Sequence, residues 1–358
     1  MSHPARAATL LIAFGLSGHA EAMDLGPFQL KGNFQFDSVF VDRGPPPLDD
    51  VDDWRRQRLA LAGRLPGEGD FKIEYDFASD AFTDAYVRFP LARGKLTAGQ
   101  FKVPFGAEHL ASSSQLVFTE NAVAGLFAPG RRLGLQYAQH GEGWGAQGAV
   151  YGEDLDEAGP DLGLAARGWW FGDAGGDARW HVAAATTHEA LRDSQIRFRM
   201  RPEVGRFGPT WLDGGRFLGA DHILRTGLEA GYQVGGLVLS GEWFRASFDA
   251  AGGHRSARGG YLQAAWTVHG PGRNYDPSNG LFVGPKGSDG LGQVELAVRY
   301  GSARIPRTGG GEAGQRGFSL GANLQYGKHL RFMLDRHLPE QRDGVDAALW
   351  SFRIALGF

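Results

Sequence analysis

The sequence contains no cysteine, which excludes disulfide bonds, thiolate catalysis and zinc sites built on cysteine. A folded chain of this kind is held together by its core or by its strand ladder alone. Net charge is also small, because 37 Lys and Arg stand against 40 Asp and Glu, giving -3 at pH 7. Without a general basic field, nothing indicates nucleic acid as a partner. Any charge selectivity must depend on where individual charges lie.

The sequence also lacks an apolar run of about eighteen residues, which excludes helical membrane spans. Its one compact apolar block lies near the N-terminus, where Arg6 precedes Ala7 to Leu16 and the site Ala20-Glu21-Ala22 follows. A charge, a short apolar block and a small-residue site are the plan of a secretory signal peptide. We therefore expect cleavage after Ala22, with residues 1–22 removed and residues 23–358 forming one domain.

Catalytic and metal motifs are missing as well. The sequence has no P-loop, no H-E-x-x-H zinc motif and no dinucleotide fingerprint. Candidate hydrolase residues exist, but their spacing is diagnostic of nothing: His109, His188, His222 and Ser112. The acidic patch Glu153 to Glu157 has the residue types for a divalent ion, yet a solvated loop explains it more simply. We expect no enzymatic activity, no metal and no cofactor.

Glycine and aromatic residues are abundant. Gly makes up 56 of 358 residues, about 16% against a usual value of about 7%, and aromatics reach 12%. They occur in short segments of alternating apolar and polar residues, a period of two that is typical of strands with two different faces. In the first segment, Phe28, Phe34 and Phe40 share one side, while Lys31 and Asp37 share the other. Similar segments recur near residues 71–77, 84–91, 228–234, 293–300 and 318–325.

This pattern predicts an all-β fold, a transmembrane antiparallel β-barrel. About sixteen segments fit a mature length of about 336 residues, or about 21 residues for each strand and its connection. Closure leaves no unpaired sheet edge in hydrocarbon, and sixteen strands leave a water-filled lumen. Short turns alternate with long connections near residues 43–53, 106–131, 153–162, 190–225, 246–258, 302–316 and 338–347. Gly270 to Gly290 breaks the rule, because it is long yet falls on the short-turn side.

The C-terminal segment supports an outer-membrane location. Trp350, Phe352 and Phe358 share one side of the last predicted strand, and Ser351 and Arg353 share the other. A final strand that ends in Phe at this spacing looks like the signal that outer-membrane barrels present to their assembly machinery. We expect a Gram-negative outer-membrane protein whose apolar side contacts lipid.

The polar side of the strands would line the channel with charges of both signs and a slight basic surplus. Two arginine clusters are prominent, Asp52 to Arg58 and Gly130 to Arg132. Arginine suits a weakly bound, moving anion because it stays charged and offers several donors. Alternation directs Arg56 and Arg58 inward, whereas Arg55 points outward unless a bulge turns it.

Several segments resemble the phosphate-selective porin O and P family. They are Trp54 to Leu59, Gly99 to Gly106 with Ser112 to Ser114 after it, Ala128 to Gly134, Arg197 to Glu203, Gly241 to Phe244 and Glu295 to Tyr300. The resemblance spans nearly the whole mature chain.

This resemblance implies a sixteen-stranded barrel, usually trimeric, with a constriction loop at residues 106–130 folded into the lumen. It implies passage of small anions such as phosphate or polyphosphate, along residues Arg55, Arg56, Arg58, Lys102, Ser112, Ser113, Ser114, Arg131 and Arg132. Phosphate-specialised members carry a basic residue soon after the serines. This chain has Gln115 there, then Leu116, and its next charge is Glu120.

Two other functions fit the same fold. A general diffusion porin would share the barrel and lack anion specificity. A receptor or adhesin would bind partners through the loop at residues 190–225, where Arg197, Arg199, Arg201, Arg206 and Trp211 form its obvious surface. The same basic residues could instead funnel anions to the pore.

Overall fold

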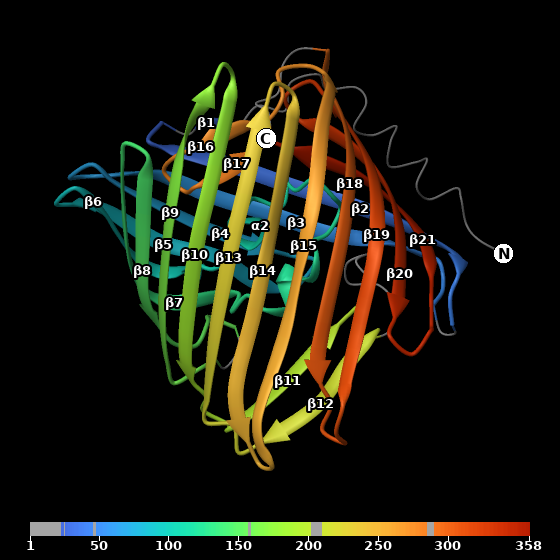
Figure 1. The fold of residues 1–358 in the computed structure, drawn as a ribbon. Coiled ribbons are helices and arrows are strands. Elements are labelled where there is room, and N and C mark those ends of the chain that lie inside the picture. The colour runs from blue at the N-terminus through green and yellow to red at the C-terminus, as the bar shows by residue number, and fades with distance from the viewer. Residues whose placement is uncertain (1–22, 25, 46–47, 157–158, 202–209, 285–289) are drawn as a thin grey trace.

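A closed antiparallel β-barrel forms the body of the molecule (Figure 1). The computed structural model describes residues 23–24, 26–45, 48–156, 159–201, 210–284 and 290–358, so the expected signal peptide lies outside the described residues. The main sheet has 17 strands, of which the two-residue β1 (Met23–Asp24) only extends the pairing of β2. Setting β1 aside leaves sixteen barrel strands, and pairing of β2 with β21 closes the ring.

The barrel strands in chain order are β2 (Phe28–Arg43), β3 (Val51–Leu65), β4 (Gly69–Asp76), β5 (Ala81–Leu91), β6 (Gly94–Lys102), β7 (Arg131–Gly141), β8 (Trp144–Tyr151), β9 (Leu162–Gly175), β10 (Ala178–Ala190), β13 (His222–Val234), β14 (Leu237–Ala250), β15 (Gly253–His269), β18 (Leu291–Pro306), β19 (Glu312–Tyr326), β20 (Leu330–Gln341) and β21 (Ala348–Gly357). Each pairs with its neighbour in sequence, as the alternating pattern predicts. In the described chain no helix is long and apolar enough to cross a membrane.

The two faces of each strand differ as their alternation requires. On β21, Trp350 is 38% exposed on the outer surface, whereas Ser351 and Arg353 on the inner face are 1% and 0% exposed. Large apolar side chains cover the outside, with Leu262 70% and Phe318 55% exposed. Such a surface is stable only against hydrocarbon.

The two ends of the barrel differ in their connections. At the turn side, where the first and last described residues, Met23 and Phe358, also lie, tight turns such as residues 142–143 and 235–236 join the strands. The loop side carries the longer connections, but three are shorter than the sequence predicted: only residues 251–252, 307–311 and 342–347 lie between strands there. The strands continue beyond the lipid-facing band, where their outward residues become polar and the alternation that marks a strand disappears.

The longest loop-side connection folds over the barrel mouth as a hairpin of β11 (Gln195–Met200) and β12 (Leu212–Leu218). Phe198 and Phe217 on its underside pack against Phe248 of β14. Trp211 reaches the opposite wall, in a cluster with Val39 and Leu349. Arg206 lies outside the described residues.

Candidate pore constriction and lining

Residues 103–130 fold into the lumen between β6 and β7 and hold a short helix, α2 (Ala107–Leu110), and a 3-10 turn, η1 (Val123–Leu126). Gly106 starts the inward path with φ 78°, a left-handed conformation that glycine adopts without strain. The backbone N–H groups of Ala107 and Glu108 donate to the Glu242 carboxylate of β14 at 2.7 and 2.9 Å. On the apolar side, Phe127 and Phe105 pack against Phe244.

The middle of this loop is fastened to three neighbouring strands. The Thr119 N–H donates to Asp335 of β20 at 2.7 Å, and its hydroxyl pairs with Ser351 of β21 at 2.9 Å. Asn323 of β19 donates to the Val117 carbonyl at 2.7 Å. Each bond pairs a buried backbone or hydroxyl group inside the barrel, so the loop is held in one position.

Glu120 is the electrostatic centre of the loop. Arg55 donates to it at 2.6 and 2.9 Å, and Arg353 at 2.9 Å. Burial raises the pKa of Glu120, but Arg55, Arg56 and Arg353 outweigh burial and hold that pKa well below its usual range. A register shift beside Gln35 leaves Arg55 as the extra residue of β3 and turns it inward. This is the bulge on which the sequence prediction depended.

A second segment enters the lumen from the turn side and accounts for the unusual stretch 270–290. Its described part forms a hairpin of β16 (Asn274–Asp276) and β17 (Leu281–Val283). Arg167 of β9 donates to the Asn279 and Gly280 carbonyls at 2.7 and 3.0 Å, and the Tyr275 hydroxyl bonds with His181 of β10 at 2.8 Å. The hairpin is therefore attached to the inner wall rather than extended away from the barrel.

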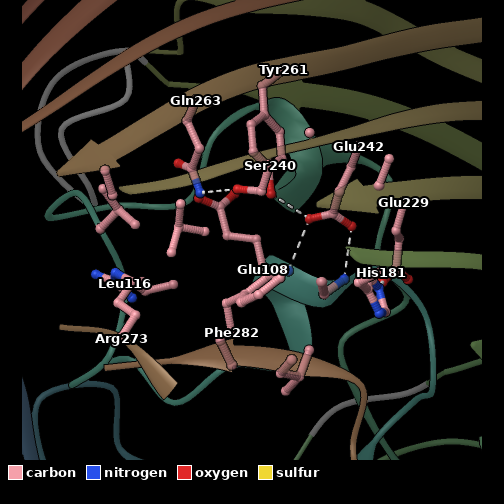
Figure 2. Close-up of a pocket in the computed structure, with 18 of the residues that line it drawn as sticks. Glu108, Leu116, His181, Glu229, Ser240, Glu242, Tyr261, Gln263, Arg273 and Phe282 are labelled. Carbon is pink, nitrogen blue, oxygen red and sulfur yellow. Dashed lines mark hydrogen bonds and ion pairs between the residues drawn. The ribbon is translucent and has the colours of Figure 1, made fainter. Parts of the chain in front are cut away.

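The hairpin and the loop meet at Arg273. This arginine forms an ion pair with Glu295 of β18 at 2.7 Å and donates to the Gln115 carbonyl at 2.9 Å. Figure 2 shows the space that they enclose against the wall, a cavity of ≈ 60 Å³ lined by Glu108, Glu229, Glu242, Tyr261 and Gln263. The lumen beside β10 to β18 is largely filled, and the larger open cavities lie along the other wall.

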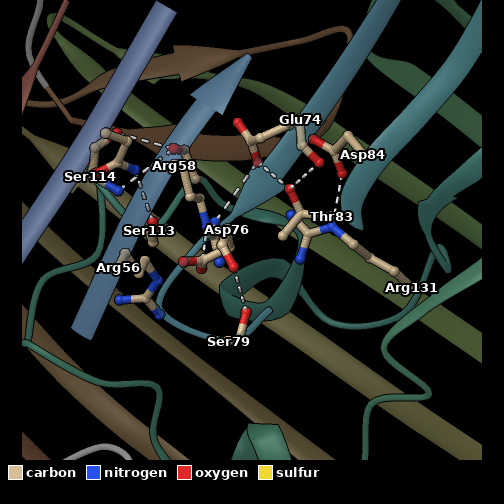
Figure 3. Close-up of polar contacts among 12 residues, drawn as sticks. Arg56, Arg58, Glu74, Asp76, Ser79, Thr83, Asp84, Ser113, Ser114 and Arg131 are labelled. Carbon is tan, nitrogen blue, oxygen red and sulfur yellow. Dashed lines mark hydrogen bonds and ion pairs between the residues drawn. The ribbon is translucent and has the colours of Figure 1, made fainter. Parts of the chain in front are cut away.

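The predicted basic residues do line this other wall, but carboxylates pair with most of them (Figure 3). Arg58 binds Asp76 at 2.8 Å, and Arg131 binds Asp84 at 2.7 Å. Arg56 donates to Gln35 at 2.5 Å and lies 3.8 Å from Glu120. The remaining two are also engaged: Arg132 binds Asp154 at 2.9 Å, and Lys102 donates to the His109 and Ala111 carbonyls at 2.8 and 2.7 Å.

The three serines lie where the loop approaches the open side of the lumen. Ser113 accepts hydrogen bonds from Asn33 and Gln35 of β2 at 3.2 and 3.4 Å, and the Ser112 and Ser114 hydroxyls are 2.9 Å apart. Ser112 also lines a cavity of ≈ 270 Å³ together with Lys102 and Arg88. Ser112 and Lys102 therefore border the open space.

A larger cavity of ≈ 440 Å³ lies toward the turn side, lined by residues of β2 to β5. It adjoins the first, since Tyr86 and Arg88 line both. Its cations are Lys31, Arg64, Lys72 and Arg88, and its one lining carboxylate is Asp70. Arg88 pairs with Asp70, and Lys72 with Asp84, but the described residues offer Lys31 and Arg64 no ion-pair partner. The open half of the lumen therefore carries a positive surplus.

Sequence reasoning did not find Arg273 or its hairpin. The hairpin's position is set by contacts with β9, β10 and β18, which are distant in sequence. The only available signal was the anomalous length of the connection.

Comparison with known proteins agrees with this architecture. Residues 28–343 match the family described as phosphate-selective porin O and P. No curated protein sequence matches the chain. Similar solved structures include OmpF of Salmonella typhi in complex with daunomycin, at 14% identity and TM-score 0.63, covering 92% of this chain and 97% of that one.

Two further structural neighbours are the anion-selective porin from Comamonas acidovorans and OmpT of Vibrio cholerae in a trimer form. The former has 14% identity and TM-score 0.60, covering 92% of this chain and 99% of that one. The latter has 10% identity and TM-score 0.61, covering 94% and 100%. At such identities the likeness establishes the barrel fold.

Proposed function

The chain belongs to the phosphate-selective porin O and P family of outer-membrane channels, and from this premise we propose that it passes small anions by passive diffusion. One observation carries the proposal: the open chamber holds Lys31 and Arg64 with no ion-pair partner among the described residues. Fixed cations in a narrow aqueous space raise the local anion concentration without holding the anion tightly.

The proposed path runs along β2 to β8. An anion that passes the hairpin of β11 and β12 reaches the space beside Ser112 and Lys102, then Arg88, then the chamber with Lys31 and Arg64. The Ser112 hydroxyl replaces part of its hydration shell at the narrow zone between the in-folded loop and the wall, while the Lys102 ammonium, bound to backbone carbonyls, contributes its charge. Since carboxylates already neutralise Arg55, Arg58 and Arg131, the preference should be moderate.

Planar-bilayer recording tests this proposal. Under a KCl gradient, the zero-current potential should have the sign of anion preference and should weaken as salt rises, because the Debye length falls from about 10 Å at 0.1 M to about 3 Å at 1 M. A cation-preferring channel would contradict it. Absence of any conductance would instead favour a receptor that binds partners through its loops.

How strongly the channel binds phosphate can be tested at Gln115. We propose weak phosphate binding, because no basic side chain directly follows the serines. Gln115 borders both the enclosed cavity and the open one, so Gln115→Lys would place an ammonium group at the narrow zone. Phosphate should block the chloride current of the variant at a lower concentration than it blocks that of wild type. Equal block in both proteins would show that this position is not on the path.

We further propose a homotrimer and a cleaved signal peptide at residues 1–22. The outer face of β2 to β5 carries linked aromatic rings, with Phe36 5.5 Å from Trp54, and Tyr75 5.0 Å from Phe82. Such a face suits contact between copies. Crosslinking of purified protein tests the trimer, and N-terminal sequencing of membrane-inserted protein tests cleavage.

A further inference from the structure

A row of arginines crosses the outer surface of the barrel at its loop side. Arg245 of β14 pairs in register with Arg258 of β15, which pairs with Arg304 of β18. All three side chains are exposed and point away from the lumen, since their neighbours Ala246, Ala257 and Ala303 are buried on the inner face.

This arrangement is unfavourable for the protein alone. Directly opposite residues on antiparallel strands have Cβ atoms only about 4.5–5.5 Å apart, and like charges there repel. Compensation is slight: Arg258 lies 3.5 Å from Glu312, and Arg245 donates to the Ser247 hydroxyl at 3.2 Å. Arg304 has no ion-pair partner among the described residues. The row therefore presents guanidinium donors that no protein group saturates.

The row lies at the level of lipid headgroups. On β14, Trp243 lies two residues from Arg245 in the direction of the membrane and is 43% exposed. On β18, Tyr300 lies four residues from Arg304 in the same direction and is 38% exposed. Exposed aromatic rings of this kind mark the boundary of the hydrocarbon layer. The opposite wall differs, because Phe40 of β2 and Phe77 after β4 lie exposed toward its loop-side end. A trimer built on that wall would leave the arginine row facing lipid.

We propose that Arg245, Arg258 and Arg304 bind the phosphate groups of a phosphorylated lipid headgroup in the outer leaflet. Guanidinium groups match phosphate oxygens in bidentate geometry, and one phosphate between two paired arginines replaces repulsion with charge-assisted hydrogen bonds. The Ser247 and Ser256 hydroxyls, paired across β14 and β15 one step farther out, supply further donors. The site lies on the lipid-facing surface and does not depend on ion passage.

Binding to purified, folded barrel in detergent tests the proposal, with diphosphorylated lipid A as the probe and its dephosphorylated form as the comparison. The triple variant Arg245→Gln, Arg258→Gln, Arg304→Gln should bind the phosphorylated lipid roughly ten-fold or more weakly. A control with the same charge change, Arg93→Gln, Lys95→Gln, Lys328→Gln, alters exposed cations at the turn side and should bind as wild type does.

Four results would overturn the proposal. They are unchanged binding by the first triple variant, equal loss in the control, equal binding of dephosphorylated lipid, and displacement of the lipid by inorganic phosphate at equal concentration. Unchanged single-channel conductance of the first triple variant confirms that it has folded. Arg304→Lys, which keeps the charge and loses the bidentate fork, should retain part of the affinity.

Discussion

Individual charges in this lumen matter according to their partners. Alternation correctly predicts that Arg58 and Lys72 face inward, yet each binds a carboxylate from a neighbouring strand. Lys31 and Arg64 also lie on the lumen-facing side of their strands, but they lack such a partner in the described chain. A paired cation contributes little net field, so under the proposed function we expect the unpaired residues to set the charge selectivity.

His109 gives the in-folded loop a pH dependence. Burial, then the neighbouring cations Lys102 and Arg131, lower the pKa of His109 to about 3. In the unfolded chain the group titrates near 6.5, so between about pH 6.5 and 3 the unfolded state binds the extra proton and folding loses stability as pH falls. The packed loop should therefore be most stable above about pH 6.5.

Limited proteolysis of the reconstituted protein measures this effect. Cleavage within residues 103–130 should increase as pH is lowered from 7 toward 4, and His109→Gln should flatten that dependence. Glu120 contributes little over most of this range, because a carboxylate with a lowered pKa loses its stabilising contribution only as pH falls below its ordinary value of about 4.5. An identical pH profile in the variant would contradict the assignment.

At the scale of one strand, β7 offers two adjacent positions with opposite surroundings. Leu135 is 48% exposed on the outer surface, and Gln136 lines the open cavity. Leu135→Arg should reduce the free energy of unfolding in bilayers by about 2–4 kcal/mol, whereas Gln136→Arg should leave it nearly unchanged. Urea titration in lipid vesicles distinguishes them. Equal loss in both variants would be incompatible with this orientation of β7.

The hairpin of β16 and β17 is the second element to test. Replacing residues 273–283 with a short Gly-Asn turn removes its contacts with Arg167, His181 and Gln115 and opens the wall beside β10 to β18. Single-channel conductance should rise. The open-channel current should also become noisier, because Arg273 no longer holds the in-folded loop in place. Conductance equal to wild type would show that the hairpin does not narrow the pore.

The elements also show how far sequence reasoning reaches. Strand number and the two faces of each strand follow from alternation and connection length, since each leaves a local trace. The family resemblance predicts the constriction loop at residues 106–130, and the in-folded segment of the structure begins three residues earlier, at 103. Two other features leave no local trace in the sequence: the bulge that turns Arg55 inward and the pairing of Arg131 with Asp84. Strand register and the reach of the side chains decide both. The same is true of Arg273, which meets Gln115 across 158 positions of sequence.

At the scale of the whole molecule, two in-folded segments and one cover leave two adjoining open cavities along the wall formed by β2 to β8. The hairpin of β11 and β12 covers the mouth, while residues 103–130 and the turn-side hairpin fill the lumen beside β10 to β18. The remaining wall, β2 to β8, carries the unpaired cations. Selectivity should therefore depend on the charge balance of this wall.

The zero-current potential under a KCl gradient tests this claim most directly, compared between two variants that each change two side chains in the same chamber. Lys31→Gln with Arg64→Gln removes two unpaired cations and should move the potential toward cation preference. Arg88→Gln with Asp70→Asn removes one ion pair, leaves the net charge unchanged and should keep the wild-type value. An unchanged potential in the Lys31, Arg64 variant, or equal shifts in both variants, would contradict the account.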